Sequence, residues 1–189
     1  MYLGVRVRFL ARIGRARQTM RLDVGFGDAA LVQENLVYPT LLDKPAPILL
    51  GYQPESAVSE KYQTIVSFGL VNSRMKDYYD IWLLSRHFRF NGLRLSKAIA
   101  QTFKRRHTSL EKEPVGLTSL LSEDSKKIAQ WRAFLARAEI FSAPSLPEAA
   151  AGIAELLLPR TSAVMHADNF NRIWEPPGPW VTCSAPDAD

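Results

Sequence analysis

The sequence predicts an α+β protein in which a small N-terminal sheet precedes a mostly helical body. Near the N-terminus apolar residues alternate with polar ones, as in strands, and from Pro54 onward they recur every three to four residues, as in helices. The 189 residues, 47% of them hydrophobic, are enough to bury a core. We expect three segments: a sheet and extended connection in residues 1–53, a helical region in 54–158 and a tail in 159–189.

The strand pattern occurs twice, around Val7 and around Leu22, and the polar stretch at 14–17 between the two runs is short enough for a hairpin. A two-stranded ribbon is not stable by itself, so its apolar face needs cover from further strands or helices. Residues 38–53 hold three prolines and predict an extended connection. Within it we expect a short buried strand at 48–50.

The helical region consists of several amphipathic segments separated by Gly, Pro and Asn. Ser73 is a suitable cap for the second of them. From Pro159 the chain becomes polar and rich in proline, which predicts a loosely ordered tail. The helices that we expect are 54–69, one that follows Ser73, 96–106, 123–138 and 146–158.

Composition narrows the function classes. The net charge of +5 and the pI near 9.5 weakly favour anionic partners such as nucleic acid or nucleotides. The one cysteine, Cys183, excludes an internal disulfide, and the three histidines have no zinc-ligand spacing. No apolar run approaches the roughly 20 residues of a membrane span, so we expect no membrane partner and a cytoplasmic location.

The stretch SRMKDYYDIW carries the densest set of chemical groups. Asp77 and Asp80 are three residues apart and share a helix face, and Lys76 can pair with Asp80 at i,i+4. One interpretation is a well-capped helix with an ordinary ion pair. The other is a site that handles metal or nucleotide, with Arg74 and Lys76 balancing the charge. Lys61 lies one helix and one short turn upstream, close enough to face the same cleft.

Other charged residues have plainer interpretations. Strand parity places Asp23 on the polar face of its strand, where pairing with a neighbouring arginine is favoured over a catalytic role. Asp28 follows two glycines and is interpreted as a turn residue. A helix ends with Lys104, Arg105 and Arg106. There these residues could bind a phosphate backbone or complement the negative end of the helix dipole.

Several collinear blocks resemble the AbiEii/AbiGii toxin family of nucleotidyltransferases, the enzymatic half of type IV toxin–antitoxin pairs. The resemblance runs from about Tyr2 to about Thr108 and continues more loosely to Pro159. The blocks that carry it are RLDVGFGD, YPTLLDKPAPILLGYQPESAVSEK, GLVNSRMKDYYDIWLLSRHFRFNG and AIAQTFKRRHT.

The resemblance implies a polymerase-β-like nucleotidyltransferase sheet, here partial, and transfer of a nucleoside monophosphate from an NTP, with Mg²⁺ held by acidic residues. Some relatives modify the acceptor end of tRNA, which makes an RNA acceptor a reasonable expectation. A cognate antitoxin encoded nearby is expected as partner. The roles implied by position are triphosphate contact for Lys61, active-site acid for Asp77, flanking charges for Arg74 and Lys76, and metal support for Asp23 and Asp80.

This chain departs from the family pattern at its N-terminus. The family places a glycine-led helix and a pair of metal-binding aspartates before the hairpin, whereas residues 1–22 contain no Asp or Glu. We therefore expect this chain to be the C-terminal part of a longer protein. We also expect the chain to be inactive alone, because it lacks the metal-binding aspartate pair. The alternative is a non-catalytic basic remnant that binds RNA or a protein partner through Lys104, Arg105 and Arg106.

Overall fold

A computed structural model describes residues 4–25, 33–40 and 44–182. Asp28 and Cys183 lie outside these residues. The chain separates into two compact units, residues 1–31 and 32–189. The strands that follow the first hairpin belong to the second unit, and the division at residues 53 and 158 stays a prediction. The α+β class is confirmed.

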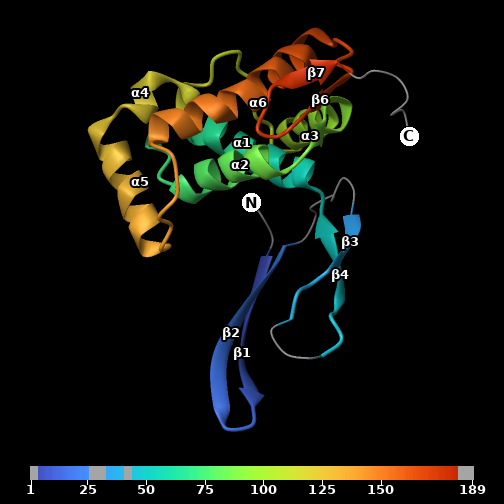
Figure 1. Ribbon diagram of the computed structural model, residues 1–189, viewed down its shortest axis with the longest axis vertical. Helices are drawn as coiled ribbons and strands as arrows, with labels where there is room; N and C mark the ends of the chain where they lie inside the picture. The colour runs from blue at the N-terminus through green and yellow to red at the C-terminus, as the bar shows by residue number, and fades with distance from the viewer. Residues whose placement is uncertain (1–3, 26–32, 41–43, 183–189) are drawn as a thin grey trace. The chain divides into compact units, whose positions relative to one another are not determined.

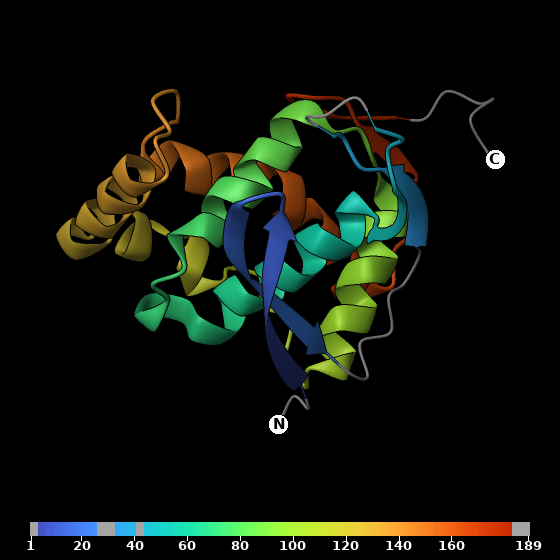
Figure 2. The ribbon, with the colours of Figure 1, turned by 90° about the horizontal axis from the view of Figure 1, so that it is seen from below.

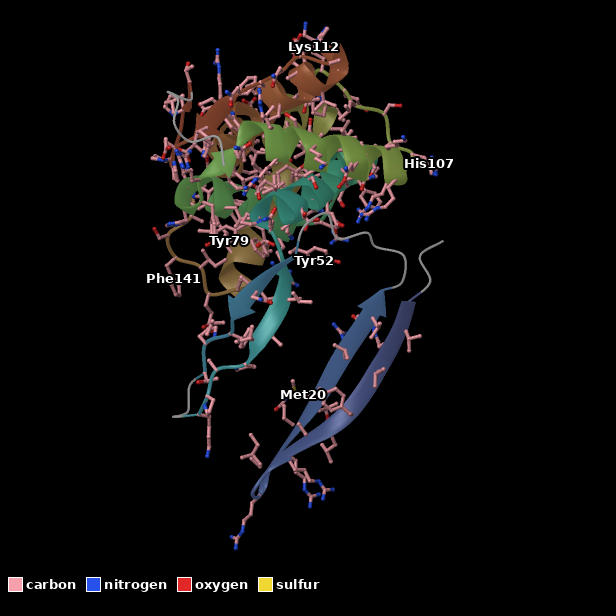
Figure 3. The ribbon with its side chains drawn as sticks, turned by 90° about the vertical axis from the view of Figure 1, so that its right-hand side faces the viewer. Met20, Tyr52, Tyr79, His107, Lys112 and Phe141 are labelled. Carbon is pink, nitrogen blue, oxygen red and sulfur yellow. The ribbon has the colours of Figure 1, made fainter. Side chains whose placement is uncertain are left out.

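The first unit is an antiparallel hairpin of β1 (Gly4–Ile13) and β2 (Ala16–Gly25). Its turn passes through Gly14, whose φ of +58° suits glycine. Val7 lies opposite Leu22 and Phe9 opposite Met20, so the apolar residues share one face, as the period-two pattern predicts. Figure 3 shows side chains that project from both faces of this hairpin.

A second hairpin begins the second unit: β3 (Gln33–Val37) pairs antiparallel with β4 (Ile48–Tyr52). The strand predicted at 48–50 therefore exists, but the prediction that it is buried is wrong. Ile48 and Leu50 are each 67% exposed, because the sheet has two strands and the described residues place no third layer over it.

Helices build the body of the second unit. Figure 1 and Figure 2 show α6 running along this body, with α4 and α5 near one end and β6 and β7 near the other. No helix in the described part of the chain is long and apolar enough to cross a membrane. The helices are α1 (Pro54–Phe68), α2 (Met75–His87), α3 (Gly92–Arg105), α4 (Ser119–Ser122), α5 (Ser125–Arg137) and α6 (Leu146–His166), with short 3₁₀ turns η1 (Gly69–Val71) and η2 (Val115–Leu117).

The core lies where α1, α2, α3 and α6 meet. Tyr62 packs against Phe103 and bonds to Thr161 of α6 through their hydroxyls, 2.9 Å apart. These two buried hydroxyls are therefore paired across helices rather than left without a partner in an apolar interior. Fully buried apolar side chains of these four helices are Val58, Tyr62, Ile65, Tyr78, Ile81, Leu95, Ile99, Ile153, Leu156 and Leu157.

Two helix boundaries differ from the predicted ones by more than two residues. α3 begins at Gly92 instead of 96, because the Asn91 side chain accepts from the backbone N–H groups of Leu93 and Arg94 and so caps the helix. The helix predicted to end at Leu158 continues through Pro159 to His166. An interior proline costs about 3 kcal/mol, and the buried residues after it offset that cost.

The prediction of a loosely ordered tail is wrong for residues 159–182. After α6, β6 (Arg172–Trp174) and β7 (Trp180–Thr182) join the short strand β5 (Phe90–Asn91) in an antiparallel sheet of order β5-β6-β7. Trp174 is 1% exposed and its indole donates to the carbonyl of Ser85 at 2.7 Å. Residues 159–182 are ordered because aromatic side chains among their prolines pack into the helical body.

Candidate functional site

The connection between α1 and α2 brings their charged residues together. Gly69, with φ of +49°, ends α1, and a β-carbon there would lie 2.9 Å from Val115. Asn72 is buried, and its side chain accepts from the backbone N–H of Arg74 at 2.9 Å. The predicted Ser73 cap is therefore wrong: Arg74 occupies the capping position, and the neighbouring Asn72 organises the turn.

Lys61 of α1 bridges two carboxylates of α2. Its Nζ lies 3.2 Å from Oδ1 of Asp77 and 2.7 Å from Oδ2 of Asp80. Because Asp77 and Asp80 are three residues apart on one helix, both can face a single ammonium group. The prediction that Lys61 faces the same site as these carboxylates is confirmed.

Two further cations complete this group. Nε of Arg74 lies 2.7 Å from Oδ2 of Asp77, and Nζ of Lys76 lies 2.5 Å from Oδ2 of Asp80, so the predicted i,i+4 pair is present. We refer to Lys61, Arg74, Lys76, Asp77 and Asp80 as the lysine–aspartate cluster. Its three cations and two carboxylates leave one net positive charge.

Burial differs within the lysine–aspartate cluster. The Asp77 side chain is 3% exposed and that of Lys61 26%, whereas Arg74 and Lys76 are more than 60% exposed. Burial by itself lowers the pKa of Lys61. The hydrogen bond to Asp80 and the charges of both carboxylates outweigh that effect, so its pKa is raised above the ordinary value. Lys61 is therefore a fixed positive charge at neutral pH.

A cavity of about 400 Å³ opens beside Asp77, between the start of α2 and one face of α5. A volume of this order suits part of a small-molecule ligand. Arg74 and Lys76 contribute its basic wall from α2, and Arg137 adds a third cation from α5. Together with the positive end of the α2 dipole, these side chains favour an anion in the cavity. The remaining lining residues are Ser73, Met75, Gln130, Ala133 and Phe134.

Aromatic side chains hold α5 against α2 and so shape this cavity. The ring centroids of Tyr79 and Phe134 are 5.9 Å apart, and those of Tyr79 and Trp131 are 6.4 Å apart. Trp131 is 2% exposed, and its indole donates to the carbonyl of Pro144 at 3.0 Å. Tilted aromatic pairs at these separations are favourable. Tyr79 of SRMKDYYDIW thus has a packing role that positions Arg137.

The carboxylates of the lysine–aspartate cluster do not fit a resident metal ion. Asp77 is bonded to Lys61 and Arg74, and Asp80 to Lys61 and Lys76. Mg²⁺ prefers several oxygen ligands in octahedral geometry, and in the described ranges no three His, Cys, Asp or Glu residues are grouped so that they could hold a metal. Both oxygens of Asp77 and Oδ2 of Asp80 already lie against cations, which leaves too few carboxylate oxygens for an octahedral ion.

Asp23 lies in the first hairpin and is bonded to arginines of the same face. It accepts from Nε of Arg6 at 2.6 Å, and Nε of Arg21 lies 3.8 Å away. The hydrogen bond from Arg6 lowers the pKa of Asp23 below its ordinary value. The pairing predicted from strand parity is confirmed, and the catalytic or metal role implied by the resemblance stays a prediction.

The basic end of α3 is partly engaged in a different network. Glu60 of α1 lies 2.9 Å from Nη2 of Arg105 and 3.4 Å from Nη2 of Arg106, and Arg106 also donates to Gln63 at 2.8 Å. Both arginines are half-buried, whereas Lys104 is exposed. Arg105 and Arg106 therefore link α3 to α1, and their role as RNA contacts stays a prediction.

Sequence reasoning missed Arg137 and Glu60. Arg137 lies in the last turn of a helix, where a basic residue is ordinary, so only the packing of α5 on α2 reveals its position at the cavity. Glu60 resembled surface charge beside Lys61. Glu60 lies one residue before Lys61 and therefore faces α3 instead of α2. The basic residues at 104–106 could have indicated that a carboxylate lies near them.

Comparison with known families identifies the family of the chain. The family model described as nucleotidyl transferase AbiEii toxin, type IV TA system, matches residues 1–155, which include the hairpin, the lysine–aspartate cluster and α5. Comparisons with curated proteins and with solved structures found no match. The chain belongs to the AbiEii nucleotidyl transferase toxin family of type IV toxin–antitoxin systems, a membership that implies an antitoxin partner.

Proposed function

We propose that the chain binds the Mg²⁺ complex of a nucleoside triphosphate at the lysine–aspartate cluster and serves nucleotidyl transfer to an RNA acceptor such as tRNA. One observation carries the proposal: Asp77, which borders a cavity whose wall carries Arg74 and Arg137, holds Lys61 together with Asp80. A fixed lysine charge beside an arginine-lined cavity suits the oxygens of a triphosphate.

The two aspartates position the lysine for this task. An ammonium group has three N–H donors, and Asp77 and Asp80 accept from two of them, which leaves one to donate to a phosphate oxygen. Asp77 also holds Arg74 at the rim of the cavity. In this proposal Asp77 and Asp80 orient cations, and the Mg²⁺ arrives with the nucleotide as part of the substrate.

In the reaction, a hydroxyl oxygen of the acceptor bonds to the α-phosphorus, the bond from that phosphorus to the bridging oxygen breaks, and pyrophosphate leaves. The Mg²⁺ of the substrate neutralises phosphate charge. Lys61, Arg74 and Arg137 add donors that stabilise the charge on the phosphate oxygens as the bond to the leaving group breaks.

Removal of the hydroxyl proton needs a base that is not already tied to cations. Asp77 and Asp80 each accept from two cations, and no Asp or Glu precedes Asp23 in the sequence. We therefore propose that these 189 residues bind the nucleotide but transfer at most traces. The cytoplasm, where NTPs and tRNA are found, is the proposed place of action, and the antitoxin is proposed to be encoded next to this chain.

Nucleotide binding is the first test. Fluorescently labelled ATP, GTP, CTP and UTP, each with Mg²⁺, are titrated with the full chain and followed by anisotropy. We expect binding of at least one nucleotide, weakened at least tenfold by Lys61→Met. The matched control is Lys97→Met, since Lys97 is an exposed lysine of α3. Equal affinity of the two variants, or no binding of any nucleotide at millimolar concentration, would overturn the proposed site.

Transfer is the second test. The chain is incubated with Mg²⁺, α-³²P-labelled NTPs and total tRNA, and labelled RNA is separated on a denaturing gel. Trace labelling that disappears in Lys61→Met is the expected result. Robust labelling would contradict the proposal that a base is missing from these residues, although it would support nucleotidyl transfer itself.

A further inference from the structure

Arginine makes up most of the polar face of the first hairpin. In the register of β1 and β2, Arg8 lies opposite Arg21 and Arg12 opposite Arg17, while Arg6 lies opposite Asp23. Residues directly opposite in an antiparallel pair have side chains on the same side of the sheet. We call this surface the arginine face; its members are Arg6, Arg8, Leu10, Arg12, Arg17, Thr19, Arg21 and Asp23.

The arginine face concentrates the charge of the chain. Its five arginines and one aspartate leave a net charge of +4, whereas the whole chain has +5. All eight residues are exposed. Asp23 is shared between Arg6 and Arg21, so Arg8, Arg12 and Arg17 have no carboxylate partner among the residues of this face.

This arrangement is unfavourable for the hairpin alone. Like charges directly opposite each other on paired strands are destabilising, and this face has two such pairs, with the pair Leu10–Thr19 between them. A two-stranded ribbon is at best marginally stable in water. A polyanion laid along the face would remove the repulsion between Arg8 and Arg21 and between Arg12 and Arg17, and would stabilise the ribbon.

We propose that the arginine face binds the sugar–phosphate backbone of single-stranded RNA. Same-face residues along a strand are about 6.8 Å apart, so the arginines form two parallel rows of cations. Guanidinium groups match phosphate oxygens in geometry as well as charge. Leu10 interrupts the row on β1 and Thr19 the row on β2. None of the eight residues is aromatic, so stacking on bases contributes nothing and binding is independent of sequence.

This inference depends on the proposed function in one respect: RNA is chosen as the polyanion because the proposed acceptor is RNA. It places RNA binding on the hairpin rather than at Arg105 and Arg106, which are paired with Glu60. The opposite face of the hairpin carries Val7, Phe9, Met20 and Leu22 and is apolar (Figure 3 labels Met20). The ribbon thus separates a face for packing from a face for the polyanion.

The test measures affinity against salt. A 5′-fluorescein-labelled 20-nucleotide oligouridylate is titrated with the full chain between 50 and 300 mM KCl. The variant Arg8→Gln/Arg12→Gln/Arg17→Gln removes three charges, and because the slope of log K against log salt is about −0.7 per phosphate contact, we expect its slope to be shallower by about 2. At 50 mM KCl the affinity is expected to fall at least tenfold.

A matched control removes the same charge elsewhere. Lys97, Lys126 and Arg132 are exposed residues of α3 and α5, and their triple replacement by glutamine is expected to change the slope by less than 1. A third variant, Arg8→Lys/Arg12→Lys/Arg17→Lys, keeps the charge and is expected to keep the slope. Equal losses in the two glutamine variants would overturn the proposal, because binding would then follow net charge alone.

Further measurements distinguish RNA from other polyanions and distinguish this proposal from the proposed nucleotide site. Oligothymidylate of the same length is expected to bind with a similar slope, since the backbone is what is recognised. Binding to phosphatidylserine vesicles that is lost in the hairpin variant, with no RNA binding by the parent chain, would overturn the choice of RNA. Lys61→Met is expected to leave oligouridylate binding unchanged, and the hairpin variant to leave NTP binding unchanged, so either proposal can fail without the other.

Discussion

Replacement of Asp77 by asparagine removes the charge at the centre of the lysine–aspartate cluster while it keeps the side-chain volume. Asp77 is 3% exposed and accepts from Lys61 at 3.2 Å and from Arg74 at 2.7 Å. The amide that replaces it retains one oxygen, so at least one cation loses its partner. Lys61 then has Asp80 as its remaining carboxylate.

The magnitude follows from burial. A hydrogen bond to a charged group contributes about 1.5–3 kcal/mol when it is shielded from water, and the bond from Lys61, which is 26% exposed, belongs near the lower limit. Arg74 is 63% exposed, so its bond contributes at most about 1 kcal/mol. We expect Asp77→Asn to lower the free energy of unfolding by about 2–2.5 kcal/mol, less than the roughly 3–5 kcal/mol of a fully buried pair.

Urea unfolding at pH 7, followed by tryptophan fluorescence, measures this loss. With a slope of about 2 kcal/mol per molar urea, the midpoint is expected to fall by about 1–1.25 M. The control is Asp168→Asn, which removes the same charge from an exposed aspartate and is expected to change the free energy by less than about 0.5 kcal/mol.

A double variant isolates the interaction between Lys61 and Asp77 from the other effects of each substitution. If Lys61 and Asp77 interact directly, Lys61→Met/Asp77→Asn destabilises the chain by at least about 0.5 kcal/mol less than the sum of the two single changes. The reasoning is refuted if Asp77→Asn unfolds at the same urea concentration as Asp168→Asn, or if the two single changes are additive.

Three further predictions concern the helical body. The pKa of Lys61 is raised in the folded chain, so the stability that Lys61 contributes is fully present below its unfolded pKa of about 10.4 and is lost as pH rises through the higher folded value. The urea midpoints of the parent chain and Lys61→Met should therefore converge above about pH 10.4. A constant difference between the two midpoints would contradict this prediction. Ser145→Ala removes the capping box that Ser145 forms with Glu148 and is expected to cost about 1 kcal/mol, measured as a fall in Tm, whereas an unchanged Tm would argue against the cap. Gly116→Ala would place a β-carbon 2.9 Å from the backbone oxygen of Ile65 and is expected to cost about 1–3 kcal/mol in urea unfolding; a cost below 0.5 kcal/mol would show that the turn can move aside.

The hairpin could be predicted from the sequence because its pattern is local. Alternation with period two places Val7 and Leu22 on one face and Asp23 with the arginines on the other, and the register confirms this. The pairing of Lys76 with Asp80 is equally local, since residues four apart on a helix are neighbours. Both follow from the geometry of a single element or of two strands joined by a tight turn.

The wrong predictions concern positions where a distant contact outweighed a local signal. Pro159 is a helix breaker by propensity, yet α6 continues because Thr161 bonds to Tyr62 and Arg160 is fully buried. The strand at Ile48 is apolar and predicted buried, yet it lies exposed in a two-stranded sheet. In each case the deciding fact was what the rest of the chain placed beside the segment.

By itself, the sequence determined the α+β class, the hairpin with its arginine face, the helices around the lysine–aspartate cluster and the family, because these depend on periodicity and on collinear motifs. Only the tertiary structure decided that Asp77 is buried, that Lys61 joins both aspartates and that Arg137 borders the cavity. The physical reason is that burial and pairing between helices depend on how α1, α2 and α5 pack, and a helical pattern shows which face is apolar but not which neighbour it meets.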